Sequence, residues 1–258
     1  MSQASGASKV PAATQTLALL RALADRGPST AAALARTVDA PRSTTYHLLS
    51  VLRDEGFVVH LADRRRWSLG PMAFTVGQAY LRHDPREELA RPILRALADE
   101  TGETAHLGVL QGAEVLYLLK ESPTRPLSAP TLITEVGVRL PAATTASGRC
   151  MLAQLPHDQV RALMSTPTAF VSRTGRGPQS LSALRRVLAV ERRQGYSVED
   201  GEVVPGYASV AVAVVDASGA PSASVSLTFR PGQASMKALI SAALASARTL
   251  DALLARGA

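Results

Sequence analysis

Residues 41–49, PRSTTYHLL, decide how the first third of the chain folds. In a helix over this stretch Thr45 and Leu49 share one face, and polar side chains share the opposite face. The pattern continues to about residue 55, and Gly56 is placed to end it. The stretch therefore predicts an amphipathic helix with an apolar back and a polar front.

The flanking segments predict a compact order of three helices followed by a hairpin. Upstream, leucines at three- and four-residue steps predict a helix over 14–26, and an Ala-rich stretch predicts a short helix over 30–37. Downstream, 57–61 and 66–70 are β-type runs around a polar turn, which indicates a hairpin. This order is typical of a winged helix-turn-helix domain, which we expect over residues 14–70.

The polar front of the third helix is a candidate for reading base edges in the major groove, whereas Thr45 is expected to pack inward. An amphipathic helix alone is more often just solvated on its polar face, and an Arg triplet alone is more often a solvated turn. The order of the elements favours a nucleic-acid contact for both. The candidate DNA-binding residues are Arg42, Ser43, Thr44, Tyr46, His47, Arg64, Arg65 and Arg66.

The charge of the chain is concentrated in its first third. The formal net charge is +7; residues 1–82 hold ten Lys and Arg against five Asp and Glu, and the other 176 hold 18 against 16. A basic excess suits a polyanionic partner, but by itself it does not distinguish DNA, RNA and a membrane surface.

Other features of the composition point to a cytoplasmic protein. No apolar run approaches the ~20 residues of a membrane span, and the N-terminus has no apolar signal-peptide core. The single cysteine, Cys150, excludes an intramolecular disulfide. The five scattered histidines and one cysteine have no spacing that suits a metal site or a nucleophile–base pair, so we expect no metal, no cofactor and no catalytic residues.

The rest of the chain is expected to form an α+β domain. Residues 1–13 read as a flexible N-terminus, 71–101 as a helical linker, and 102–258 as the second domain. Strand runs flanked by helices, without regular βαβ alternation, predict an α+β fold. The expected strands are 104–110, 114–120, 209–215 and 223–229; the expected helices are 147–155, 157–164, 180–194 and 235–256; and 121–143 reads as irregular.

Several blocks of this sequence resemble the IclR family of bacterial regulators. Residues 41–49 are similar to that family's recognition helix, Pro-Lys-Ser-Thr-Ala-His-Arg-Leu-Leu. The combination of a Thr-Ala-Ser-Gly-Arg block with a Gly-Tyr-Ser-Val-Glu-Asp block is specific to the family. The other similar blocks are DEGFV (54–58), WSLG (67–70), LADETGET (97–104), LPAATTASGR (140–149), GYSVEDGE (195–202) and the Pro-Gly pair 205–206.

The resemblance implies a ligand-responsive regulator, more often a repressor, that binds double-stranded operator DNA as a homodimer or homotetramer. It also implies a C-terminal GAF-like domain that binds a small effector, frequently an organic or aromatic acid. Small residues before the helix at 147–155 would let a carboxylate approach its N-terminus, although Ser and Thr there can equally be caps. The candidate effector-binding residues are Thr145, Ala146, Ser147, Gly148, Glu199, Asp200, Ser209, Ser226 and Thr228. The alternative is a small-molecule-binding or enzymatic domain whose winged helix mediates protein contacts only.

Overall fold

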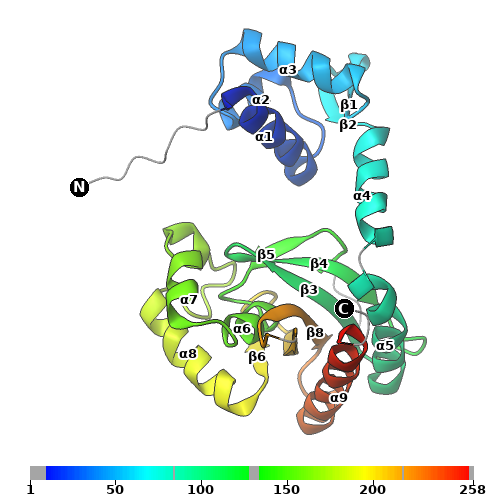
Figure 1. The fold of residues 1–258 in the computed structure, drawn as a ribbon, viewed down its shortest axis with the longest axis vertical. Coiled ribbons are helices and arrows are strands. Elements are labelled where there is room, and N and C mark those ends of the chain that lie inside the picture. Colours follow the sequence, from blue (N-terminus) through cyan, green and yellow to red (C-terminus); the bar gives the residue numbers. More distant parts are fainter. Residues whose placement is uncertain (1–9, 84, 128–133, 217, 256–258) are drawn as a thin grey trace. The chain divides into compact units, whose positions relative to one another are not determined.

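The computed structural model describes residues 10–83, 85–127, 134–216 and 218–255, and the chain divides into two compact units, 1–83 and 84–258 (Figure 1). No helix in the described part of the chain combines the length and apolarity needed to cross a membrane.

The N-terminal unit has the winged helix-turn-helix order expected from the sequence. Its core is built from apolar residues of its first three helices and its two strands, with Leu19, Leu34, Leu49 and Trp67 almost completely buried. Its elements are α1 (Pro11–Arg26), α2 (Ala31–Thr37), α3 (Arg42–Asp54), β1 (Val58–Leu61), a 3-10 turn (Ala62–Arg64), β2 (Arg66–Leu69) and α4 (Pro71–His83).

Two details of this unit differ from the expectation. α1 begins at Pro11, so residues 11–13 are helical rather than part of a flexible N-terminus; residues 1–9 lie outside the described residues. Pro fits a first helical turn because the amide that it lacks would have no partner there. Thr30, expected as the first residue of the helix over 30–37, instead caps α2 by accepting a hydrogen bond from the amide of Ala33.

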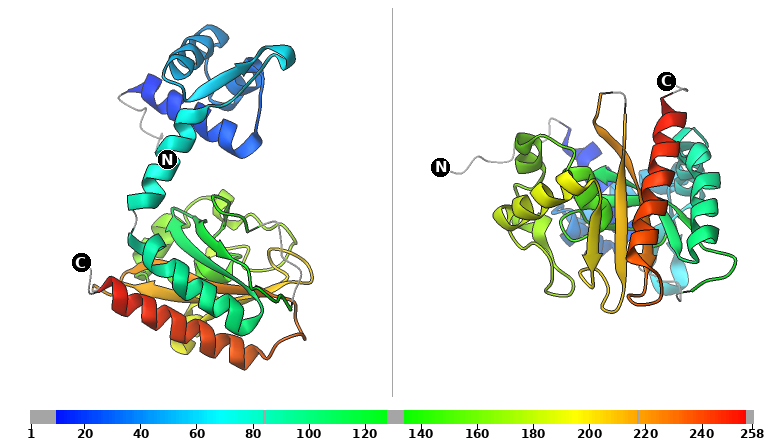
Figure 2. Two further views of the ribbon diagram at one scale, coloured as in Figure 1. Left: turned by 90° about the vertical axis from the view of Figure 1, so that its right-hand side faces the viewer. Right: turned by 90° about the horizontal axis from the view of Figure 1, so that it is seen from below.

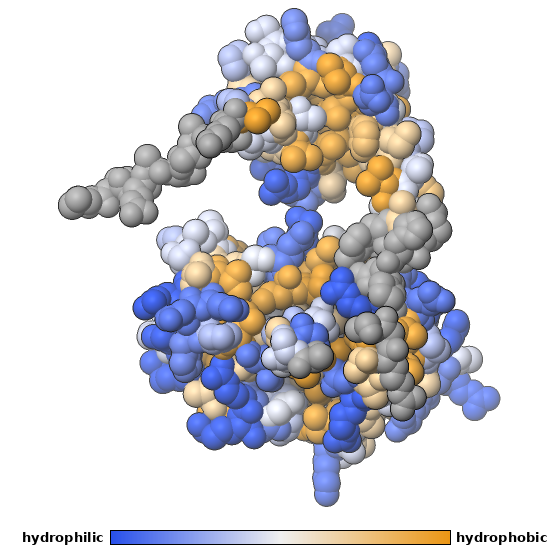
Figure 3. Space-filling model, viewed as in Figure 1, coloured by the Kyte–Doolittle hydropathy of each residue, from blue (hydrophilic) through white to orange (hydrophobic). Residues whose placement is uncertain are grey.

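Several large hydrophobic side chains of this unit remain on the surface. Phe74 is 70% exposed and Val76 is 52% exposed on α4, and Leu17 is 60% exposed on α1. Figure 3 shows hydrophobic residues, in orange, gathered on the face of this unit turned towards the viewer.

The C-terminal unit is a six-stranded antiparallel sheet with helices on both faces. The strand order is β5-β4-β3-β8-β7-β6. The short edge strands β5 and β6 were not expected from the sequence. The elements are α5 (Pro85–Thr101), β3 (Thr104–Gln111), β4 (Glu114–Glu121), β5 (Arg139–Pro141), α6 (Ala146–Leu152), α7 (His157–Leu163), a 3-10 turn (Pro167–Phe170), α8 (Leu181–Gln194), β6 (Ser197–Asp200), β7 (Ala208–Val215), β8 (Pro221–Phe229) and α9 (Met236–Leu254).

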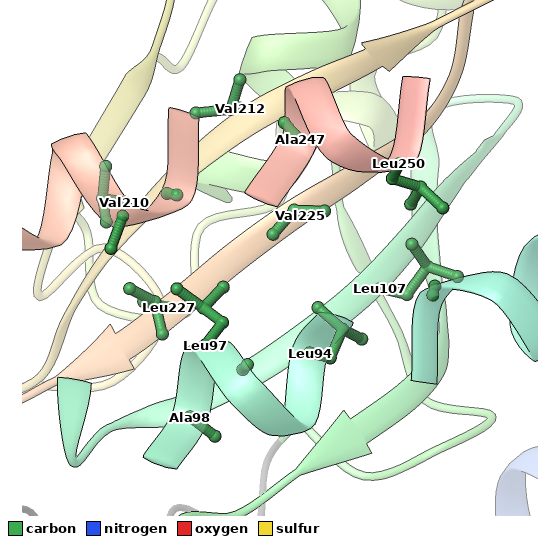
Figure 4. Packing of buried hydrophobic residues seen from close by; sticks show 14 of the residues in the cluster. Leu94, Leu97, Ala98, Leu107, Val210, Val212, Val225, Leu227, Ala247 and Leu250 are labelled. Carbon is green, nitrogen blue, oxygen red and sulfur yellow. The ribbon is translucent and has the colours of Figure 1, made fainter. Parts of the chain in front are cut away.

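The two faces of the sheet are covered by different helices (Figure 2). On one face α5 and α9 pack together, and Leu94 and Leu97 of α5 meet Leu107, Val225 and other strand residues in a continuous apolar cluster (Figure 4). This packing corrects the expected linker over 71–101: its second half, α5, is part of the core of the C-terminal unit. On the other face lie α6, α7 and α8, with a second apolar cluster.

Candidate functional site

The polar face of α3 is open to solvent. The back of the helix is held by Thr45, which is 0% exposed and whose hydroxyl donates to the Pro41 carbonyl at 3.1 Å. The inward position expected for Thr45 is therefore confirmed. Arg42, Ser43, Tyr46 and His47 are exposed, and Thr44 is half-buried. Of the five candidate contacts on this helix, four have side chains free to reach a groove.

The three wing arginines also lie on the surface, around the turn between β1 and β2. Arg64 is 3.6 Å from the carboxylate of Asp63, and Arg66 donates to the Pro28 carbonyl at 3.3 Å. Arg65 has a φ of +48°, a left-handed conformation that turns the chain between the two strands. The exposed ion pair of Arg64 is weak, so this cation can exchange Asp63 for a phosphate.

The face of the large sheet that packs against α6 carries an unusual share of polar side chains. Strand register places Thr104, Thr228, Ser209 and Glu199 opposite one another on the neighbouring strands β3, β8, β7 and β6. Two residues further along β3, His106 lies opposite Ser226. Polar side chains in such a covered position must find partners in the protein or in a ligand.

A cavity opens between this face, α6 and the loop after β6. Its lining surrounds about 310 Å³ of space not filled by atoms, and part of this space is open to solvent. The lining is mixed, as in many small-molecule sites, and among the described residues it includes no Lys or Arg. The lining residues are Tyr117, Thr134, Leu140, Thr145, Ala146, Glu199, Val203, Val204, Tyr207, Ser209 and Thr228.

Glu199 is the charged group of this cavity. Its carboxyl accepts hydrogen bonds from Ser209 Oγ at 2.8 Å and from the Glu202 amide at 3.1 Å. Burial raises the pKa of Glu199 to about 7, an effect that the hydrogen bonds from Ser209 and Glu202 only partly oppose. The group therefore changes its charge close to neutral pH.

The nine candidate effector-binding residues separate into three groups. Thr145, Ala146, Glu199, Ser209 and Thr228 line the cavity. Ser147 and Ser226 lie beside it, fully buried, with a 3.0 Å hydrogen bond between their hydroxyls. The third group, Gly148 and Asp200, does not line the cavity.

Gly148 and Asp200 have other positions in the fold. An added Cβ on Gly148 would lie 2.3 Å from the backbone of Ala142, so the glycine allows α6 to pack tightly on the preceding loop. A contact between Gly148 and a ligand stays a prediction, and the packing of α6 already accounts for a glycine here. Asp200 is exposed at the end of β6, because alternation along the strand turns it away from the face that Glu199 shares.

Arg149 forms a buried ionic cluster beneath the cavity. Its guanidinium is 2% exposed, 2.9 Å from the carboxylate of Glu191 on α8 and 2.6 Å from that of Glu202. It also donates to the carbonyl of Val198. Nothing in the sequence pattern separates this arginine from a surface one, since its partners lie 42 and 53 residues away. The cluster fixes α6 against α8 and the loop that carries Glu202.

Cys150 is a core residue. It is 3% exposed, its thiol donates to the Ser147 carbonyl, and burial raises its pKa well above the usual range. A thiol of this kind is unreactive as a nucleophile. Among the described residues, no cluster of three or more His, Cys, Asp or Glu side chains could hold a metal ion.

Comparisons with known proteins agree with both units. The family models of the IclR helix-turn-helix domain and of the bacterial transcriptional regulator IclR C-terminal domain match residues 12–62 and 78–252. The transcriptional repressor IclR of Escherichia coli is 30% identical over 227 residues, which cover 85% of this chain and 80% of the relative.

Solved structures agree as well. An IclR transcriptional regulator from Alicyclobacillus acidocaldarius superposes with a TM-score of 0.81 at 25% identity, over 95% of this chain and 98% of that one. An IclR homologue from Microbacterium hydrocarbonoxydans, crystallised in complex with 4-hydroxybenzoate, has a TM-score of 0.77 at 24% identity, over 96% and 100% of the two chains. The chain belongs to the IclR family of bacterial transcriptional regulators.

Proposed function

We propose that this regulator is a repressor whose operator binding responds to a small organic acid held in the cavity of the C-terminal unit. The observation that carries the proposal is the cavity of mixed polar and apolar lining around Glu199, in the same chain as a winged helix whose polar face is open to solvent. The E. coli relative, which bears the name repressor, supports the direction of regulation.

The cavity suits an acid that is bound through hydroxyl groups. No cation lines it among the described residues, so a carboxylate would be held by hydroxyls such as those of Thr145 and Thr228. An ionised Glu199 would repel it, and a protonated Glu199 can donate a hydrogen bond to it. The 4-hydroxybenzoate found with the Microbacterium homologue is the first compound to try.

Self-association is part of the proposal. The exposed side chains of Leu17, Phe74 and Val76 are larger and more apolar than a solvated surface requires. We propose that they pack against a second copy of the chain, so that two reading helices engage a two-fold symmetric operator.

The test combines DNA binding with ligand binding by the full-length protein. An electrophoretic shift with the upstream region of the protein's own gene, compared with unrelated genomic fragments, measures sequence preference at moderate salt. A thermal-shift screen of carboxylic acids identifies effectors, and each is then added to the shift assay. Equal affinity for all fragments, or for operator with and without every stabilising acid, contradicts the proposal.

A further inference from the structure

One histidine in the C-terminal unit is fully buried in the middle of the sheet. His106 lies in the middle of β3, is 0% exposed, and neither ring nitrogen makes a hydrogen bond of normal geometry to another described residue. Burial lowers its pKa to about 3; Lys120 adds to the lowering, and the backbone of Thr134 opposes it. The imidazole is therefore neutral at pH 7 and has one hydrogen-bond donor and one acceptor.

His106 lies directly beside the cavity. Its ring meets the ring of Tyr117 edge-on, with the centroids 5.4 Å apart, and Tyr117 is part of the cavity lining. Thr134 also lines the cavity, and its hydroxyl is buried without a hydrogen-bond partner in the described chain. Two polar side chains without a hydrogen bond, Thr134 in the lining and His106 adjoining it through Tyr117, therefore mark one part of the cavity, the His106 end.

This end is far from the carboxyl of Glu199. β3 and β6 are separated by β8 and β7, so that three strand spacings, about 14 Å of sheet, lie between His106 and Glu199. At the Glu199 end the polar groups are already paired with one another, through Ser209 and Thr228. At the His106 end they are not.

Unpaired buried polar groups are rare in folded proteins and call for an explanation, of which a missing ligand group is one. The charges around His106 indicate which kind of ligand group would fit there. The nearest cation, Lys120, already pairs with the carboxylate of Glu135. A neutral imidazole and a neutral hydroxyl suit an uncharged group that both donates and accepts, and a hydroxyl does both.

We propose that His106 and Thr134 recognise a hydroxyl group on the effector, at the end of the ligand far from Glu199. The inference rests on the proposed function, because it needs a ligand in this cavity. The effector is then a molecule with two polar ends, and His106 and Thr134 distinguish it from analogues that lack the second one.

The experiment compares benzoate with 4-hydroxybenzoate by calorimetry on the full-length protein. The wild type is expected to bind 4-hydroxybenzoate about tenfold more tightly, because benzoate leaves both side chains unpaired. The ratio of the two affinities should fall to about one in His106→Leu and in Thr134→Val. Each substitution removes the polar atoms of its side chain and keeps a similar volume. Thr228→Val, at the Glu199 end, should lower the affinity for both compounds and leave the ratio of the two affinities unchanged.

Each outcome decides the matter. Equal affinity of the two compounds for the wild type, or a preference retained in both variants, overturns the inference and leaves the cavity as an effector site. Failure of both compounds to bind, while other acids raise the melting temperature, overturns the inference in the same way. If no acid binds at all, both the inference about His106 and Thr134 and the proposed function are wrong. Should His106→Leu not fold, Thr134→Val alone decides.

Discussion

The hydroxyl of Ser209 donates a 2.8 Å hydrogen bond to the buried carboxyl of Glu199 across the pair of strands β7 and β6. Ser209 also lies 3.2 Å from the hydroxyl of Thr228 on β8, so side chains link three adjacent strands in the cavity wall. Because burial raises the pKa of Glu199 to about 7, the charge of the cavity wall changes close to neutral pH.

Binding of a carboxylate ligand is expected to weaken as the pH rises through 7. Glu199 must carry a proton to share with the ligand, and each pH unit above its pKa lowers the protonated fraction about tenfold. Calorimetry with 4-hydroxybenzoate between pH 6 and 8.5 measures the slope of the affinity against pH. Glu199→Gln keeps a neutral side chain and should bind with no such slope. A wild-type affinity that is the same across this range contradicts the prediction.

His106 is expected to make the fold sensitive to acid. Its pKa is near 6.5 in the unfolded chain and about 3 in the folded one, so between these values the unfolded state binds more protons. Stability is therefore full above pH 6.5 and falls by about 1.4 kcal/mol per pH unit as the pH drops towards 3. Urea unfolding of the wild type and of His106→Leu between pH 4 and 7 measures how much of the pH dependence of the free energy of unfolding comes from His106. If the free energy of unfolding changes with pH equally in the two proteins, the prediction is wrong.

Arg149→Met is expected to lower the free energy of unfolding by about 3–5 kcal/mol, because it leaves the buried carboxylate of Glu191 and the half-buried carboxylate of Glu202 without their cation. Arg161→Met is the matched control, since the pair Arg161–Asp158 is exposed and should contribute less than about 1 kcal/mol. Chemical denaturation of both variants checks the difference. Similar losses for both would show that the buried cluster is not a structural anchor.

Gly148→Ala is expected to destabilise the C-terminal unit by about 1–3 kcal/mol or more, because the new methyl would overlap the rigid backbone of Ala142. Gly77→Ala on α4 serves as the control. No atom lies within 4 Å of its added Cβ, and alanine favours a helix by up to about 1 kcal/mol over glycine. Thermal unfolding should show a lower melting temperature for Gly148→Ala only. An unchanged melting temperature for Gly148→Ala argues against the tight contact between α6 and Ala142.

The double variant Arg42→Ala with His47→Ala is expected to lose specific DNA binding while its unfolding curve stays unchanged, since both side chains are exposed. Arg53→Ala is the control: Arg53 lies at the far end of the same helix and pairs with its neighbour Asp54. Fluorescence anisotropy with operator and random duplexes measures both affinities. Undiminished operator binding by the double variant would favour a winged helix that serves protein contacts only.

Much of the N-terminal unit was predictable because its determinants are local. The period of 3.6 residues places Thr45 and Leu49 on one face of α3 wherever that helix sits. The paired β-type runs around residues 62–65 likewise predict the wing from neighbouring residues alone. The boundary of the linker was not predictable, because the apolar stripe of α5 looks the same whether it faces a partner or its own sheet.

By itself the sequence determined which segments of the N-terminal unit are helices and strands, and which residues α3 presents to solvent. Only the tertiary structure decided the cavity. Thr134 and Tyr207 come from segments without a pattern. They and Tyr117 of β4 line one cavity with Glu199 because β6, too short to predict, pairs with β7 in a register that turns Glu199 inward and Asp200 outward. A shift of one residue would exchange the two. Such contacts depend on pairing between strands far apart in the chain, which no local periodicity encodes.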